Sequence, residues 1–251
     1  NNEDAEAPPL TKSSLHSEKE TRHRLLEKKP NQFAILSLVV ISIGGIVEFI
    51  PTFLVKSNIP TIASVRPYTP LELEGRDIYI REGCNNCHSQ MIRPFRSEVE
   101  RYGEYSKAGE YVYDHPFLWG SRRTGPDLHR VGGKYNDNWH FNHMYDPRLT
   151  SPGSIMPQYP WIIKNDLDIS LTTNKINAMV QLGVPYTQNE LDNAVYLLKN
   201  QAAQIEKNLR QDPEFVKNYG NANIQDKEIV ALIAYLQRLG TDIKAEQTAK
   251  N

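Results

Sequence analysis

The chain has 251 residues and a formal net charge of −1, with 29 lysines and arginines against 30 aspartates and glutamates. This length allows one or two domains, and the balanced charge gives no reason to expect binding to nucleic acid. The composition is polar overall, with one long apolar exception near the N-terminus.

That exception follows a polar tail. Residues 1–30 are rich in Lys, Glu, Ser and Asn and predict a mobile cytoplasmic segment. Residues 33–55 form an almost uninterrupted apolar run, which as a helix would be about 34 Å long at about 1.5 Å per residue. A cleaved signal peptide has a shorter apolar stretch nearer the N-terminus, and a core helix rarely lacks polar breaks for so long. We therefore predict a retained transmembrane helix over residues 31–56 in the lipid bilayer.

Basic residues before this span outnumber those just after it. Arg22, Arg24, Lys28 and Lys29 precede the span, and Lys56 and Arg66 follow it. The positive-inside rule then predicts a single pass through the bacterial inner membrane, with a cytoplasmic N-terminus and a periplasmic C-terminal domain. Glu48 lies inside the span, where it either snorkels to the interface or faces a partner membrane subunit. Because the sequence does not begin with Met, we expect a processed product or a piece of a longer polypeptide.

The most specific motif of the chain is Cys84-Asn85-Asn86-Cys87-His88. This C-x-x-C-H pattern is typical of covalent attachment of a c-type haem. Two thiols three positions apart on one helical turn can each add to a haem vinyl group, and the next residue then faces the iron. We therefore expect one covalently bound haem c, with thioether bonds from Cys84 and Cys87 and with His88 as the proximal iron ligand.

Other uses of this cysteine pair fit less well. A thioredoxin-like motif expects a βαβ context, which the sequence does not predict. A disulfide between Cys84 and Cys87 would close a very small loop and stabilise little. A tetrahedral zinc site needs two more ligands at suitable spacing, and the sequence has no second cysteine pair.

A haem that transfers electrons usually has a second axial ligand, Met or His. Met156 lies in a loop, residues 151–157, where an irregular backbone can hold a weak thioether ligand, and we predict it as the sixth ligand. Met144 is the next candidate, and the pair His140 and His143 is a bis-His alternative.

The two remaining methionines are less suitable ligands. Met91 follows His88 on the proximal side and cannot reach round the ring. Met179 occurs in a helical pattern and is expected in the core.

Several residues are candidates for the surroundings of the haem. The carbonyl of Pro126 is positioned in the sequence to accept the ring N–H of His88, and Leu128 is expected to pack on the haem face. Trp139 or Tyr135 could donate hydrogen bonds to the propionates. Four arginines could pair with the propionates, with a solvated surface charge as the equal alternative for each: Arg93, Arg96, Arg122 and Arg123.

The rest of the chain predicts a helical domain over residues 71–240. Three prolines suggest a stiff linker over residues 57–70, and helical periodicity over 71–80 leads into the cysteine motif. Residues 188–212 predict a largely exposed helix. Residues 227–240 predict an amphipathic helix with one apolar face and Gly240 at its C-terminal cap, and residues 241–251 predict a frayed tail.

Together these motifs resemble class I cytochromes c and, more specifically, the mono-haem subunit (CcoO or FixO) of the cbb(3)-type cytochrome oxidases. The stretches that carry the resemblance are EGRDIY at 74–79, HSQMIRPFR at 88–96, YDHPFLWGS at 113–121, TGPDLH at 124–129 and LGVPYT at 182–187. The resemblance implies a mainly α, class I cytochrome c-like haem domain with insertions, tethered by one N-terminal transmembrane helix. The helical region around 190–225 looks longer than the family needs.

The resemblance also implies a role. The haem would take electrons from a dihaem cytochrome c subunit or a soluble cytochrome c. It would pass them to a catalytic haem-copper oxidase subunit, where oxygen is reduced to water and protons are pumped. This chain would have no oxygen-reducing site of its own, because two axial ligands leave no open position on the iron. The rivals are a free-standing membrane-anchored electron shuttle and a haem-based sensor, and the long segment 90–124 favours subunit docking over a simple shuttle.

Overall fold

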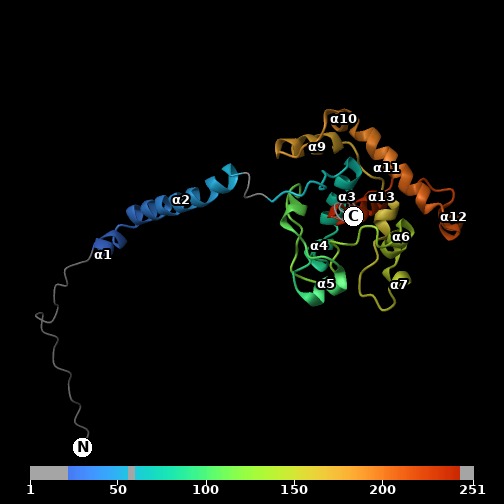
Figure 1. Ribbon diagram of the computed structural model, residues 1–251, viewed down its shortest axis with the longest axis horizontal. Helices are drawn as coiled ribbons and strands as arrows, with labels where there is room; N and C mark the ends of the chain where they lie inside the picture. The colour runs from blue at the N-terminus through green and yellow to red at the C-terminus, as the bar shows by residue number, and fades with distance from the viewer. Residues whose placement is uncertain (1–21, 56–59, 244–251) are drawn as a thin grey trace, which may run out of the picture. The chain divides into compact units, whose positions relative to one another are not determined.

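The computed structural model describes residues 22–55 and 60–243. The chain divides into two compact units, Asn1–Ile59 and Pro60–Asn251. The first contains α1 (Arg22–Glu27) and the long α2 (Pro30–Leu54) (Figure 1). The predicted tail therefore contains a short helix at its C-terminal end, while residues 1–21 lie outside the described part.

By length and composition, α2 can cross a membrane. Its stretch Pro30–Thr52 has a mean hydropathy of 2.5 and buries none of its side chains within the protein. Glu48 is exposed on this helix, and its backbone carbonyl accepts a hydrogen bond of 3.1 Å from the Thr52 hydroxyl. Pro51 is accommodated within the last turn.

The second unit is helical, which confirms the predicted fold class. Its helices are α3 (Pro70–Arg81), α4 (Cys84–Cys87), α5 (Arg96–Tyr102), the 3₁₀ helix η3 (Ala108–Tyr111), α6 (Asp137–Tyr145), α7 (Pro147–Thr150), α8 (Pro160–Lys164), α9 (Thr172–Gln181), α10 (Gln188–Asp192), α11 (Ala194–Leu209), α12 (Pro213–Tyr219) and α13 (Glu228–Arg238). Among the described residues the β-structure amounts to one isolated bridge, between Asp166 and Lys227.

The centre of this unit is the crossing of α3 and α13. Helix α3 begins at a capping box, in which the Thr69 side chain accepts from the Glu72 amide and Glu72 accepts from the Thr69 amide. A Cβ atom on Gly75 would lie 1.9 Å from the carbonyl oxygen of Ala231, so the two helices can approach this closely only with glycine at that position.

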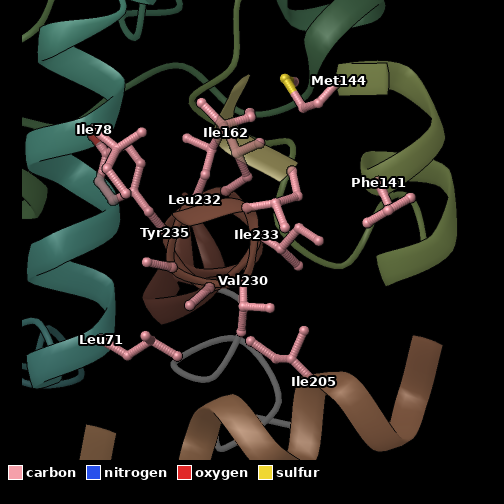
Figure 2. Close-up of a cluster of buried hydrophobic side chains, with 14 of the residues drawn as sticks. Leu71, Ile78, Phe141, Met144, Ile162, Ile205, Val230, Leu232, Ile233 and Tyr235 are labelled. Carbon is pink, nitrogen blue, oxygen red and sulfur yellow. The ribbon is translucent and has the colours of Figure 1, made fainter. Parts of the chain in front are cut away.

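Helix α13 is buried on all sides, not on the single face that the sequence predicted. Apart from Gln237, each of its residues is buried. Figure 2 shows its side chains pointing toward Leu71 and Ile78 of α3, Ile205 of α11 and Phe141 of α6. A helix with neighbours around its circumference needs apolar residues beyond one stripe.

The helix predicted over residues 188–212 is instead two helices, α10 and α11. It was also predicted to be largely exposed, but α11 buries one face. Figure 1 shows α9 to α12 following one another around the α3–α13 pair. Helix α11 buries five residues spaced at helical intervals: Ala194, Leu198, Ala202, Ile205 and Leu209. This apolar stripe packs against α3, α6 and α13, while the polar residues that dominate its composition face solvent.

Most of the segment predicted as a stiff linker, residues 57–70, lies in the second unit. That unit begins at Pro60 and so includes residues 60–69. The Tyr186 hydroxyl donates to the Tyr68 carbonyl at 2.7 Å. At the other end Ile243 is 3% exposed, so the tail predicted from residue 241 is packed at its start, and residues 244–251 lie outside the described part.

Candidate haem site

The cysteine motif occupies a single helical turn directly after α3. Gly83, with φ of +70°, lets the chain reverse between α3 and α4, a conformation that favours glycine. The thiols of Cys84, half-buried, and Cys87, exposed, are both free. Burial and the nearby Glu82 carboxylate raise the pKa of the Cys84 thiol to about 12. The turn thus presents two thiols at the spacing that the motif predicts.

The His88 ring is held by the backbone of the segment that follows residue 124. Its Nδ1 lies 2.8 Å from the carbonyl oxygen of Pro126, the contact that the sequence predicted. Because a carbonyl oxygen can only accept, Nδ1 carries the proton and Nε2 is left as a lone-pair donor. Burial lowers the pKa of His88, which favours the neutral ring that ligates metals.

Gly125 is the residue against which the imidazole packs. A Cβ atom at this position would lie 2.1 Å from Cε1 of His88, closer than any real contact allows. The Gly125 amide also donates to the Cys87 carbonyl at 3.0 Å. This role was not predicted from the sequence, although a glycine directly before the expected acceptor was a usable signal.

Asp127 fastens the same segment to the residues after the motif. Its carboxylate accepts from the Ser89 hydroxyl at 2.6 Å and from the Met91 amide at 2.9 Å. The amide of Leu128 donates to the Ser89 carbonyl at 2.9 Å, and the Leu128 side chain is partly buried against the core. Two stretches about 38 residues apart in sequence are thereby joined beside His88.

The methionines occupy different environments. Met156 is partly buried and packs against the main core cluster, as Cys84 and Leu128 do. Met144 is 7% exposed and lies within that cluster on α6 (Figure 2), and Met179 is 8% exposed in a second cluster. The core position predicted for Met179 is confirmed, while the ligand role of Met156 stays a prediction.

The candidate arginines mostly have protein partners. Arg93 pairs with Glu98, whose side chain is 8% exposed. Arg123 pairs with the same carboxylate at 2.7 Å and donates to the Ser89 hydroxyl at 2.7 Å. These guanidinium groups lower the pKa of Glu98 to about 2. Arg96 is 92% exposed, beside Glu100.

Trp139 belongs to a stack of three rings on and before α6. Its ring lies 3.9 Å from that of Tyr135 and 4.6 Å from that of His143, nearly parallel to both. His143 Nδ1 lies 2.6 Å from the Thr150 hydroxyl, whereas His140 is buried with no hydrogen-bond partner at Nε2. The stack was not predicted from the sequence, although the spacing of four residues between its members would have indicated it.

The residues fit a haem. One imidazole presents a free ring nitrogen, two free thiols lie on the turn before it, and Gly125 leaves room for the ring in that orientation. A family model described as cytochrome c oxidase, mono-heme subunit/FixO, matches residues 23–243.

The chain belongs to this family. It is therefore a mono-haem subunit of a cytochrome c oxidase, and it combines a cytochrome c-like helical domain with one apolar N-terminal helix. The match continues through α9 to α12, so the helical region around 190–225 is part of the family and not an extension of it. A search of curated proteins finds no match for this chain.

Proposed function

We propose that this subunit is a membrane-anchored c-type cytochrome that relays electrons within a cbb(3)-type oxidase. The donor is a dihaem cytochrome c subunit or a soluble cytochrome c, and the acceptor is the catalytic haem-copper subunit. The observation that carries the proposal is the His88–Pro126 contact beside two free thiols, in a chain of the mono-haem oxidase subunit family.

In this proposal Cys84 and Cys87 would hold the haem c covalently, and His88 and Met156 would bind its iron. A bound haem supplies reversible one-electron chemistry. Pro126 fixes the ring of His88 and raises its basicity by accepting a hydrogen bond from Nδ1–H, as partners of metal-ligating histidines do. Because His88 and Met156 would both bind the iron, oxygen reduction would take place in the partner subunit.

Helix α2 anchors the domain on the periplasmic side of the bacterial inner membrane, since basic residues are concentrated on its N-terminal flank. Glu48 is costly in hydrocarbon unless it meets a polar partner, so we place it against the catalytic subunit. Replacing Glu48 with Leu should weaken assembly, and normal assembly of E48L would count against this contact.

The segment from Gln90 to Thr124 supports docking to another subunit. Three of its five carboxylates point inward: Glu98, Glu110 and Asp114 are 8%, 4% and 7% exposed at the side chain. Arg93 and Arg96 are 54% and 92% exposed, and Glu100, which pairs with Arg96, is 62% exposed. Because Arg101 and Arg122 are exposed as well, basic groups outnumber acidic ones on the outer face of the segment, which fits an acidic partner surface.

An aromatic pair stands on the same segment. The rings of Phe117 and Trp119 are stacked at 4.5 Å and remain 54% and 37% exposed. Tyr111 packs edge-on against both, and the Trp119 carbonyl accepts from the Gln90 amide at 2.8 Å, which ties the pair to the residues after the haem motif. Rigid exposed aromatics of this kind are typical binding hot spots.

The docking proposal is tested with the double variant F117A/W119A. We expect about tenfold or greater loss of intact oxidase from detergent extracts, since hot-spot aromatics contribute about 2 kcal/mol or more. The c-type spectrum of the subunit should be retained. Replacing Tyr196, which is 65% exposed on α11, with Ala is the matched control. Intact complex with F117A/W119A would remove this face from the interface.

The relay itself is tested by a reduced-minus-oxidised visible spectrum of the tagged protein, extracted gently from native membranes. We expect b-type bands beside the c-type band, because the catalytic partner should be purified with it. A c-type band alone, under conditions that keep other respiratory complexes intact, would favour a free-standing electron shuttle.

A further inference from the structure

A small polar cavity lies where the chain enters the second unit, beside the end of α13. Its volume is about 30 Å³. Its walls come from residues 65–68, from the segment around η3, from His129 and from residues 238–242. None of these residues belongs to the haem motif.

Two of the side chains that line this cavity are buried and incompletely hydrogen-bonded. Asp114 and Arg238 are 7% and 6% exposed at the side chain, and Oδ1 of Asp114 and Nε of Arg238 have no hydrogen-bond partner. Each faces an opposite charge at 3.4 Å, Arg76 and Glu72 respectively, without a hydrogen bond between those atoms. Buried polar atoms in native proteins nearly always have a partner, often ordered water.

The charges around the cavity are already paired. Asp114 faces Arg76, and Asp242 pairs with Arg238. Glu110 pairs with Arg130. A bound ion is therefore not needed to neutralise the charges around the cavity. The ligand that fits is small and neutral, and can both donate to Asp114 and accept from Arg238.

We propose that this cavity is a binding site for about two ordered water molecules, which bridge Asp114 and Arg238. A water needs about 10–15 Å³ of such space and two to four polar partners, and the unpartnered atoms Asp114 Oδ1 and Arg238 Nε supply two of them.

The bridging waters belong to a network of polar contacts that holds the segment around Arg66 against the rest of the domain. Arg238 donates to the carbonyl of Arg66 at 2.8 Å, and the Arg66 amide lies 3.4 Å from Asp242. Arg238 and Asp242, which line the cavity, thus hold the backbone of Arg66. The waters stabilise this segment because they complete the hydrogen bonding of Asp114 and Arg238, the second of which binds the Arg66 carbonyl.

The direct test is an experimental structure of the haem-loaded full chain, at a resolution that shows ordered water. We expect density within hydrogen-bond distance of both Asp114 Oδ1 and Arg238 Nε. A dry cavity, or a peak with the coordination of a metal ion, would overturn the proposal.

Two variants test the role of the water in solution. Asp114→Asn and Asp114→Leu both remove the charge that faces Arg76, but Asn keeps atoms that can bind water. We expect backbone hydrogen exchange of residues 65–69, measured in the assembled protein, to rise about 5- to 30-fold more in D114L than in D114N. Equal exchange in the two variants would contradict the proposal, and should D114L fail to fold, the density experiment decides alone.

Discussion

The orientation of the His88 ring depends on a single missing methyl group at Gly125. The ring fits between the Pro126 carbonyl and the Gly125 backbone, and any side chain on residue 125 would meet Cε1. With a side chain at residue 125, the imidazole must either rotate away from Pro126 or displace the backbone that Asp127 anchors. Ring orientation and ligand basicity are set by such contacts in metal sites.

We therefore expect Gly125→Ala to lower haem incorporation and to shift the reduction potential of the haem that is bound. Loss of a partner of a metal-ligating histidine typically costs about 10- to 100-fold in metal affinity or activity. Thr124→Ala, at the exposed neighbouring residue, is the control and should behave as wild type. Haem content per protein and a redox titration measure both effects; unchanged values in G125A would show that the ring tolerates another position.

Alanine substitutions distinguish Met156 from Met144 as the sixth ligand, because the two are expected to change different properties. Met156→Ala should open the iron, so that the reduced protein binds carbon monoxide rapidly, and should lower the potential, because Met ligation raises it. Met144→Ala should instead cost about 2–5 kcal/mol of stability, since this side chain is buried in the core cluster. Carbon monoxide binding by M144A but not by M156A would reverse the assignment.

At the scale of elements, α11 shows why composition alone misjudges a helix. Its sequence is polar on average, yet Leu198, Ile205 and Leu209 fall on the stripe that contacts α13 and its neighbours. The stripe stabilises the whole unit, because α13 is buried on all sides and α11 is one of the helices that bury its apolar side chains.

Ile205→Ala should therefore destabilise the domain by about 2–5 kcal/mol, the usual cost of truncating a core aliphatic side chain. Tyr196→Ala on the same helix removes a side chain that is 65% exposed and should change stability by less than about 0.5 kcal/mol. Chemical denaturation of the holo domain measures both. Similar midpoints for I205A and wild type would mean that α11 is dispensable.

At the scale of the whole molecule, buried histidines link the stability of the domain to pH. Burial lowers the pKa of His140 to about 4, whereas an unfolded histidine titrates near 6.5. Between these pH values the unfolded chain binds a proton that the folded chain does not. Stability should thus be complete above about pH 6.5 and should fall as the pH drops toward 4.

His140→Phe should reduce this pH dependence, because residue 140 then no longer takes up a proton on unfolding. Urea unfolding of wild type and H140F at about pH 7 and about pH 4.5 gives the comparison. Burial also lowers the pKa of His129, so part of the slope should remain in H140F. An identical slope in the two proteins would show that His140 does not contribute.

The sequence by itself determined the haem motif, the apolar span, helices α3 and α13, and the Pro126 contact. Apart from the Pro126 contact, which joins residues 38 apart, these features depend on residues close in the chain: the cysteine spacing, the length of one apolar run and the periodicity of two helices. Tertiary structure decided the rest. Gly75 matters because Ala231, far along the chain, approaches it, and Glu98 and Glu110 point inward because Arg123 and Arg130 meet them there. Contacts between distant residues leave no local pattern, so the burial of α13 on all sides and the polar cavity beside its end are visible only in the folded chain.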